Sequence, residues 1–109
     1  MRNSGELRAR RHYRLRGYRI LAENAWAAGN EVDLVVRRGR SLVFCEVKQR
    51  RREDFGAPIE HVGAEKQRRV RRAAEAWLAA HPELDGLDTS FEVVSVGPGG
   101  LRRTRDAFE

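Results

Sequence analysis

The feature that most constrains the fold is a pair of short alternating segments, residues 31–36 and 41–48, joined by Arg37-Arg38-Gly39-Arg40. Alternation is typical of β-strands, because successive side chains point to opposite faces of a sheet. A connection this short cannot hold a crossover, so the two strands are predicted to form an antiparallel hairpin. The chain must therefore build part of a sheet around this hairpin.

The alternation divides the hairpin into an apolar face, predicted to face a core, and a face that carries every charge. The apolar set is Val32, Leu34, Val36, Val43, Cys45 and Val47, and the opposite set is Glu31, Asp33, Val35, Leu42, Phe44, Glu46 and Lys48. With the turn about Arg38-Gly39, Glu31 is predicted to lie opposite Glu46. Asp33 is then predicted opposite Phe44 and diagonal to Glu46. This register gathers three carboxylates on one face.

Clustered carboxylates need an explanation, because like charges opposite one another destabilise a sheet. A divalent cation held by Asp33, Glu46 and Glu31 would offset the repulsion, and Mg²⁺ or Mn²⁺ prefers such oxygen ligands. The alternative is a solvated sheet face whose acids pair with nearby arginines. The acids alone do not separate these two interpretations.

Lys48 favours the metal site. It follows Glu46 by two residues and so shares its face, and only two of the 22 basic residues are lysines. Arginine stays protonated in proteins, whereas a lysine amine can shift its pKa and can hold a water or a phosphoryl oxygen. Lys48 is therefore predicted to orient the attacking water in a phosphodiester hydrolysis. Chance placement of one lysine is the competing interpretation.

The rest of the chain predicts one domain, residues 1–109, in which one sheet packs against helices. The predicted helices run from Asn3 or Ser4 to about Arg16 and from about Gly63 to Ala80. A first strand is predicted at 18–23, before a turn region at 24–30, and further strands at 91–96 and 101–107. The apolar positions of the second helix recur at helical spacing: Val70, Ala73, Ala74, Trp77 and Leu78.

A net charge of +6 and a pI near 10.6 make a polyanion the first partner to consider. Nucleic acid is the preferred partner, DNA ahead of RNA, and an anionic membrane surface is the second choice. The residues predicted to grip phosphates are Arg50, Arg51, Arg52, Lys66 and Arg69. The alternative interpretation of each is an ordinary solvated charge on the protein surface. Trp26 is a candidate for stacking on a base, whereas Trp77 is predicted to be core.

The single cysteine, Cys45, excludes an internal disulfide and a multi-thiolate zinc site, and it is predicted to be a core residue. The first residues contain no apolar signal segment, and no apolar run approaches the roughly 20 residues that span a bilayer. We therefore expect a cytoplasmic protein with no membrane segment.

Several motifs carry a resemblance. Asp33 with Glu46-Val47-Lys48 matches the D…(D/E)-x-K pattern of the PD-(D/E)xK nuclease superfamily. Further motifs recur in a fixed order around it: Gly5-Glu6, Gly17-Tyr18, Asn24, Glu31-Val32-Asp33, Leu42-Val43-Phe44, Phe55-Gly56 and Lys66. Over nearly its whole length the chain resembles the YraN-type family of small bacterial proteins. Its layout is also similar to that of the archaeal Holliday-junction resolvases.

The resemblance implies an α/β restriction-endonuclease-like core, a mixed central β-sheet flanked by helices. It implies Asp33 and Glu46 as metal ligands, Lys48 as the water-orienting residue and Glu6 as an additional acid. Glu6 shares a helical face with Ala9 and Tyr13, which would turn it toward the sheet. An ordinary first-turn glutamate, favoured by the helix dipole, is the alternative.

Two positions depart from the family pattern. Asn30 stands where the family has glycine, and Ser90-Phe91-Glu92 stands where it has Arg-Phe-Asp. Neither change removes a proposed ligand, and the second would weaken a structural ion pair.

Three functions are consistent with the sequence. The first is an Mg²⁺- or Mn²⁺-dependent endonuclease acting on DNA, including branched or otherwise structured DNA. The second is a nucleic-acid-binding module that keeps the nuclease fold without cleavage, and the third is an accessory factor that binds a protein partner. A homodimer is expected for the first, because a domain this small needs a second copy to grip two duplex arms.

Overall fold

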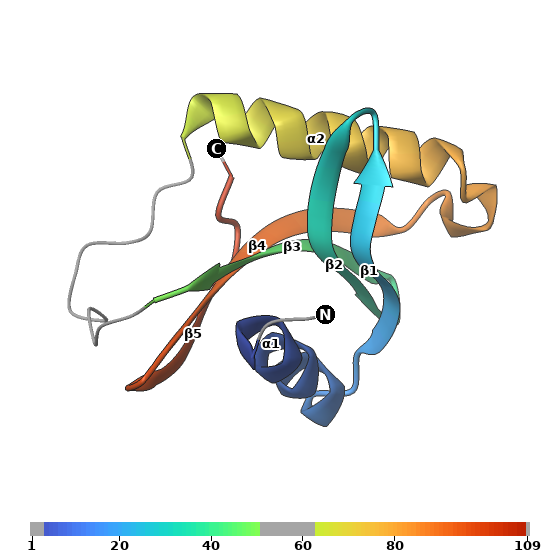
Figure 1. Ribbon diagram of the computed structural model, residues 1–109. Helices are drawn as coiled ribbons and strands as arrows, with labels where there is room; N and C mark the ends of the chain where they lie inside the picture. Colours follow the sequence, from blue (N-terminus) through green and yellow to red (C-terminus); the bar gives the residue numbers. More distant parts are fainter. Residues whose placement is uncertain (1–3, 51–62, 109) are drawn as a thin grey trace.

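The computed structural model describes residues 4–50 and 63–108, which form a five-stranded sheet with a helix on each face (Figure 1). The elements are α1 (Ser4–Leu15), β1 (Arg19–Ala27), β2 (Asn30–Arg38), β3 (Ser41–Gln49), α2 (Ala64–Ala79), a short 3-10 helix η1 (Pro82–Leu84), β4 (Asp88–Gly97) and β5 (Gly100–Thr104). This is the predicted order of elements, and the mixed α/β class is confirmed. No helix within the two described ranges has the length and apolar character needed to cross a membrane.

The strands lie side by side in chain order, and among the described strands only β3 and β4 pair in parallel. An antiparallel neighbour can be reached by a tight turn, but a parallel neighbour requires a crossover. The connection between β3 and β4 contains α2, which returns across one face of the sheet while α1 covers the other (Figure 1).

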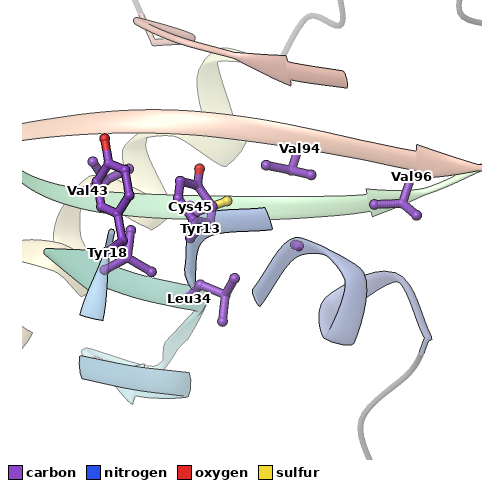
Figure 2. Close-up of a cluster of buried hydrophobic side chains, with 9 residues drawn as sticks. Tyr13, Tyr18, Leu34, Val43, Cys45, Val94 and Val96 are labelled. Atoms are coloured by element: carbon purple, nitrogen blue, oxygen red, sulfur yellow. The ribbon is translucent and has the colours of Figure 1, made fainter. Parts of the chain in front are cut away.

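Two clusters of buried side chains join these layers. The α1 cluster comprises Ala9, Tyr13, Tyr18, Leu34, Val36, Val43, Cys45, Val94 and Val96 (Figure 2). The α2 cluster comprises Val32, Val35, Leu42, Phe44, Val70, Ala73, Ala74, Trp77 and Leu84. The core positions predicted for Cys45 and Trp77 are confirmed. Because both faces are covered, the parallel pair lies in the surroundings that parallel strands require.

The β2–β3 turn lies one residue later than predicted. Arg38 pairs with Ser41, so the turn residues are Gly39-Arg40 and the register is shifted by two residues. Gly39 has a φ of +58°, which glycine adopts without steric cost. A shift of two residues leaves every side chain on its own face, so the apolar pattern could not distinguish the two registers.

The shift changes which acids are neighbours. Val35, not Asp33, lies opposite Phe44. The predicted pairing of Glu31 with Glu46 is also wrong, since Glu31 is displaced by the same two residues. The β2–β3 pairing stops immediately before Asp33, which leaves Asp33 as the β2 acid next to Glu46.

β1 is longer than predicted, running to Ala27 rather than ending at Glu23 before a turn region. Asn24 has a φ of +50°, in the left-handed region that asparagine tolerates better than most residues, and the strand continues past it. The turn is only Ala28-Gly29, with φ values of +52° and +74° that suit a tight hairpin turn. The turn signals therefore marked a two-residue turn and one irregular position.

Val32 is a second departure from the predicted pattern. It was expected to share a face with Leu34 and Val36, but it packs in the α2 cluster while they pack in the α1 cluster. The register shift of the β1–β2 ladder lies elsewhere, between Ile20 and Ala22, but no pair is formed between Glu23–Leu34 and Ala25–Val32, where Asn24 has a φ of +50°. Strict alternation of β2 therefore fails beside this unpaired position, between Leu34 and Val32.

A buried ion pair joins β4 to β5. Arg103 donates through Nε to Glu92 Oε1 at 2.6 Å and through Nη2 to Glu92 Oε2 at 3.1 Å. The Tyr13 hydroxyl of α1 donates to the same Glu92 Oε1 at 2.7 Å, and Arg103 also donates to the Tyr18 hydroxyl at 3.0 Å. The acid of the Ser90-Phe91-Glu92 segment thus retains an ion pair and ties α1 to the sheet.

Arg103→Met should reduce the free energy of unfolding by about 3–5 kcal/mol, because it leaves Glu92 buried without its cation. The matched control is Arg40→Met, since Arg40 pairs with Asp88 at 3.8 Å where both side chains are more than 70% exposed. The control should cost less than about 1 kcal/mol. Urea unfolding followed by circular dichroism measures both, and equal losses would contradict this account.

Candidate functional site

The β1–β2 hairpin, the end of β3 and the start of α2 line a cavity of about 300 Å³. Acids from the sheet and bases from α2 meet there: Trp26, Glu31, Asp33, Glu46, Lys66 and Arg69 are among its lining residues. The three acids predicted as metal ligands, Glu31, Asp33 and Glu46, thus line one pocket. All three come from the predicted hairpin, and the two bases come from the crossover helix.

Asp33 is held by the backbone of the neighbouring strand. Its Oδ2 accepts a hydrogen bond from the Val47 amide at 2.8 Å, just beyond the last β2–β3 pair. The Asp33 side chain therefore accepts a hydrogen bond from β3 at the point where the backbone pairing of β2 with β3 stops. This contact places the Asp33 carboxylate beside the strand segment that carries Glu46 and Lys48.

Burial and neighbouring acids strongly raise the pKa of Asp33. Burial is the largest cause, followed by the charge of Glu46, and together with smaller contributions from Glu6 and Glu31 they raise the pKa of Asp33 from 3.8 to about 7. The Val47 hydrogen bond opposes the shift. A half-buried carboxylate facing three other carboxylates is disfavoured in its charged form.

Glu46 is paired on one side only. Its Oε1 lies 3.1 Å from the Lys66 ammonium, and this ion pair joins β3 to the first turn of α2. Burial raises the pKa of Glu46, and the contact with Lys66 opposes that shift. The other oxygen, Oε2, is buried and accepts no hydrogen bond from the described residues. A buried carboxylate oxygen in this state is a position where a cation fits.

Lys48 follows Glu46 on the same face of β3, as predicted, but it is not one of the residues that line the cavity. Burial, then the charge of Arg50, lowers the pKa of the Lys48 amine, while Glu46 raises it. Lys48 therefore lies beside the pocket, within the electrostatic field of Glu46 and Lys66.

Asn24 of β1 links Glu6 of α1 to Glu31 of β2. With its amide nitrogen turned toward them, Asn24 donates to Glu31 Oε1 at 2.7 Å and to Glu6 Oε1 at 3.2 Å. The Glu6 charge also reaches Asp33. The predicted additional acid thus comes near the site, and Glu31 lies against Asn24 rather than opposite Glu46.

The predicted phosphate-binding residues have different positions. Arg50 follows the end of β3 and is half-buried, with its amide donating to Val96 O at 2.6 Å. Arg51 and Arg52 lie outside the described residues. Lys66 and Arg69 line the cavity, and Arg69 also lies 3.8 Å from Glu65.

Sequence reasoning missed the role of Lys66 against Glu46 and the bridging role of Asn24. A signal for Lys66 was present, because the two lysines of this arginine-rich chain are Lys66, which lines the cavity, and Lys48, which lies beside it. Nothing in the local pattern around Asn24 marks it as a bridge, since the sequence predicts a turn region there.

Within residues 4–50 and 63–108, no three His, Cys, Asp or Glu side chains are close enough together to form a complete metal site. Three carboxylates, those of Glu31, Asp33 and Glu46, line the pocket, and Mg²⁺ usually keeps several waters and takes only one or two carboxylates from the protein. Asp33 and Glu46, with the buried Oε2 of Glu46, therefore match the donor set of a hydrated Mg²⁺ or Mn²⁺ ion.

The fold and site define a class: a small mixed α/β domain with an acidic pocket at the end of its central strand and a lysine beside it. The chain belongs to the family described as Uncharacterised protein family UPF0102, whose sequence profile matches residues 5–96. This is the YraN-type family that the motifs indicated. The matched segment contains every acid of the site and ends before β5.

Relatives from several bacteria share most of the chain. A UPF0102 protein of Methylorubrum extorquens (strain PA1) is 49% identical over 96 residues, which cover 87% of this chain and 73% of that protein. One from Frankia casuarinae is 42% identical over 109 residues, covering 95% and 92% respectively. One from Xanthomonas oryzae pv. oryzae is 44% identical over 94 residues, covering 84% and 77%. Their names give the family alone.

Asp33→Asn should stabilise the protein at pH 8 in EDTA by about 1–2 kcal/mol. This gain is smaller than the pKa shift alone implies, because water in the open pocket screens part of the repulsion. The folded protein holds the Asp33 proton up to about pH 7 and the unfolded chain loses it near pH 4. The destabilisation by Asp33 is therefore absent below pH 4 and complete above pH 7.

Thermal unfolding of both proteins from pH 4 to pH 8 measures this difference, which should vanish at the acid end. Asp85→Asn, at an exposed position after η1, is the matched control and should show no such trend. A constant difference between wild type and Asp33→Asn at every pH would contradict the assignment.

Proposed function

We propose that this protein is a metal-dependent endonuclease that hydrolyses phosphodiester bonds of DNA, with branched or otherwise structured DNA as the expected substrate. In this proposal the domain is a restriction-endonuclease-like member of the PD-(D/E)xK superfamily. The observation that carries it is the half-buried pair Asp33 and Glu46 in one pocket, with Lys48 next on the Glu46 face.

The energetic cost of this arrangement supports a function. Two neighbouring carboxylates taken partly out of water repel each other and destabilise the folded state. Groups with such shifted pKa values occur preferentially at functional sites. Hydrophobic or amide side chains at these positions would be more stable, so the acids are best explained by what they bind.

Asp33 and Glu46 would hold Mg²⁺ or Mn²⁺, and Glu46 Oε2 is a buried oxygen available for it. A bound divalent ion lowers the pKa of a water and offsets negative charge on phosphoryl oxygens. The Val47 amide fixes the Asp33 carboxylate against β3, which keeps both acids on rigid strands.

Lys48 would hold the attacking water or a phosphoryl oxygen by hydrogen bonding from its ammonium. Burial lowers its pKa, which favours exchange of a proton with a bound water. Lys66 and Arg69 place positive charge along the α2 side of the cavity, where a phosphate flanking the cleaved bond would lie. Contacts of this kind give affinity with little sequence preference.

One observation favours a second function, a binding module that does not cleave. The Lys66 ammonium already neutralises Glu46 at 3.1 Å, so a cation from the chain occupies part of the acidic pair. In that case the basic residues would bind nucleic acid without a metal. A cleavage assay separates this function, and the accessory protein-binding role, from the nuclease.

The purified protein should cut at least one substrate in a panel of labelled duplex, flap, four-way-junction and single-stranded DNA and RNA when Mg²⁺ or Mn²⁺ is present, and none in EDTA. Lys48→Ala should lose cutting by about 100-fold or more, because the group that positions the water is removed. Gel analysis of the products measures the rates.

Arg40→Ala is the control for lost positive charge, since Arg40 lies in the turn at the opposite end of β3. It should retain cutting. Salt-sensitive binding without cleavage of any substrate, equal in wild type and Lys48→Ala, would replace the nuclease by the binding module. Capture of a protein partner without nucleic-acid binding would indicate the accessory role.

Lys66→Met should bind Mn²⁺ several-fold more tightly than wild type, because it removes the cation that competes for Glu46. The same variant should bind DNA more weakly in EDTA. Isothermal titration measures the first and fluorescence anisotropy the second. Unchanged Mn²⁺ affinity in a folded Lys66→Met protein would show that Glu46 is not a ligand.

A further inference from the structure

The chain has two tryptophans with opposite surroundings. Trp77 of α2 is 7% exposed, and its ring stacks on His81 at 4.0 Å and meets Phe44 edge-on at 5.9 Å. Trp26 of β1 is 70% exposed. Among the described residues no ring contact includes Trp26. A large flat apolar ring is therefore presented to solvent near the hairpin tip.

Trp26 lies at the candidate site. It pairs directly with Glu31 across the β1–β2 hairpin, so the two side chains leave the same face. Glu31 is two residues from Asp33, and Trp26 lines the same cavity as Asp33, Lys66 and Arg69. The exposed ring thus adjoins a pocket whose lining includes carboxylates as well as positively charged side chains.

This combination distinguishes Trp26 from the other exposed apolar side chains. Leu7 and Leu15 of α1 are exposed, but they line a separate cavity among arginines. Isolated exposed leucines are ordinary on protein surfaces. An indole differs because its face stacks on nucleic-acid bases, and one such contact contributes substantially to binding single strands.

Stacking on a protein ring also determines whether the bound base is paired or unpaired. In a continuous duplex both faces of a base are covered by its neighbours, so a protein ring has no face to stack on. Unpaired nucleotides in single strands, loops and ends present a free face and are bound by aromatic side chains. A phosphate held by Lys66 and Arg69 would place an adjoining unpaired base within the region of Trp26.

We propose that Trp26 stacks on an unpaired base next to the phosphate bound in the pocket. The substrate class is then nucleic acid with single-stranded or locally unpaired nucleotides, rather than continuous duplex. The position of the phosphate rests on the proposed function, but the stacking itself requires neither metal nor cleavage.

The test uses the full chain in EDTA, where cleavage is absent. A short oligothymidylate and a blunt hairpin duplex are titrated into wild type, Trp26→Ala, Trp26→Phe and Leu15→Ala. Tryptophan fluorescence should be quenched by oligothymidylate in wild type but not in Trp26→Phe, whose remaining tryptophan is buried. Trp26→Ala should bind oligothymidylate about 5- to 100-fold more weakly, with duplex affinity unchanged within about twofold.

Trp26→Phe should keep part of the affinity because it keeps a ring, and Leu15→Ala should match wild type. The proposal is overturned if Trp26→Ala binds oligothymidylate like wild type, or weakens both ligands equally. It is also overturned if sedimentation shows that Trp26→Ala dissociates a dimer, since the ring would then be covered by a second copy. Quenching without metal-dependent cutting would leave the stacking intact and remove the nuclease, whereas cutting without quenching would remove only the stacking.

Discussion

The parallel pairing of β3 with β4 is the constraint on which the rest of the structure depends. A parallel partner cannot be reached by a turn, so the chain must cross the sheet through α2. The crossover covers one face of β3 while α1 covers the other. It also brings the first turn of α2 back to the end of β3, where Lys66 meets Glu46. The same connection therefore completes the core and closes one side of the acidic pocket.

Two glutamates on neighbouring strands differ in how completely the fold satisfies their carboxylates. Glu92 on β4 is buried with both oxygens engaged by Arg103 and a further bond from Tyr13. Glu46 on β3 is also largely buried, but one of its oxygens has no partner among the described residues. The first arrangement is complete as folded, whereas the second is completed only by something that enters the pocket.

Much of the site was predictable because strand alternation is a local property. Glu46 and Lys48 share a face whatever the register, and the apolar positions of α2 mark its buried side before any contact is known. The predicted neighbours of Glu46 were less secure. A two-residue register shift preserves the alternation, so only the turn at Gly39-Arg40 made Asp33 rather than Glu31 the adjacent acid on β2.

The sequence by itself determined the order of elements, the mixed α/β class, the hairpin and the two acids with their lysine, because these follow from periodicity and spacing along the chain. Only the tertiary structure decided the contacts between distant segments. The Lys66–Glu46 pair, the bridge made by Asn24 and the exposure of Trp26 beside the pocket belong to this group. Such contacts depend on how α1, α2 and the hairpin meet, and no local pattern encodes the distance between residues far apart in the chain.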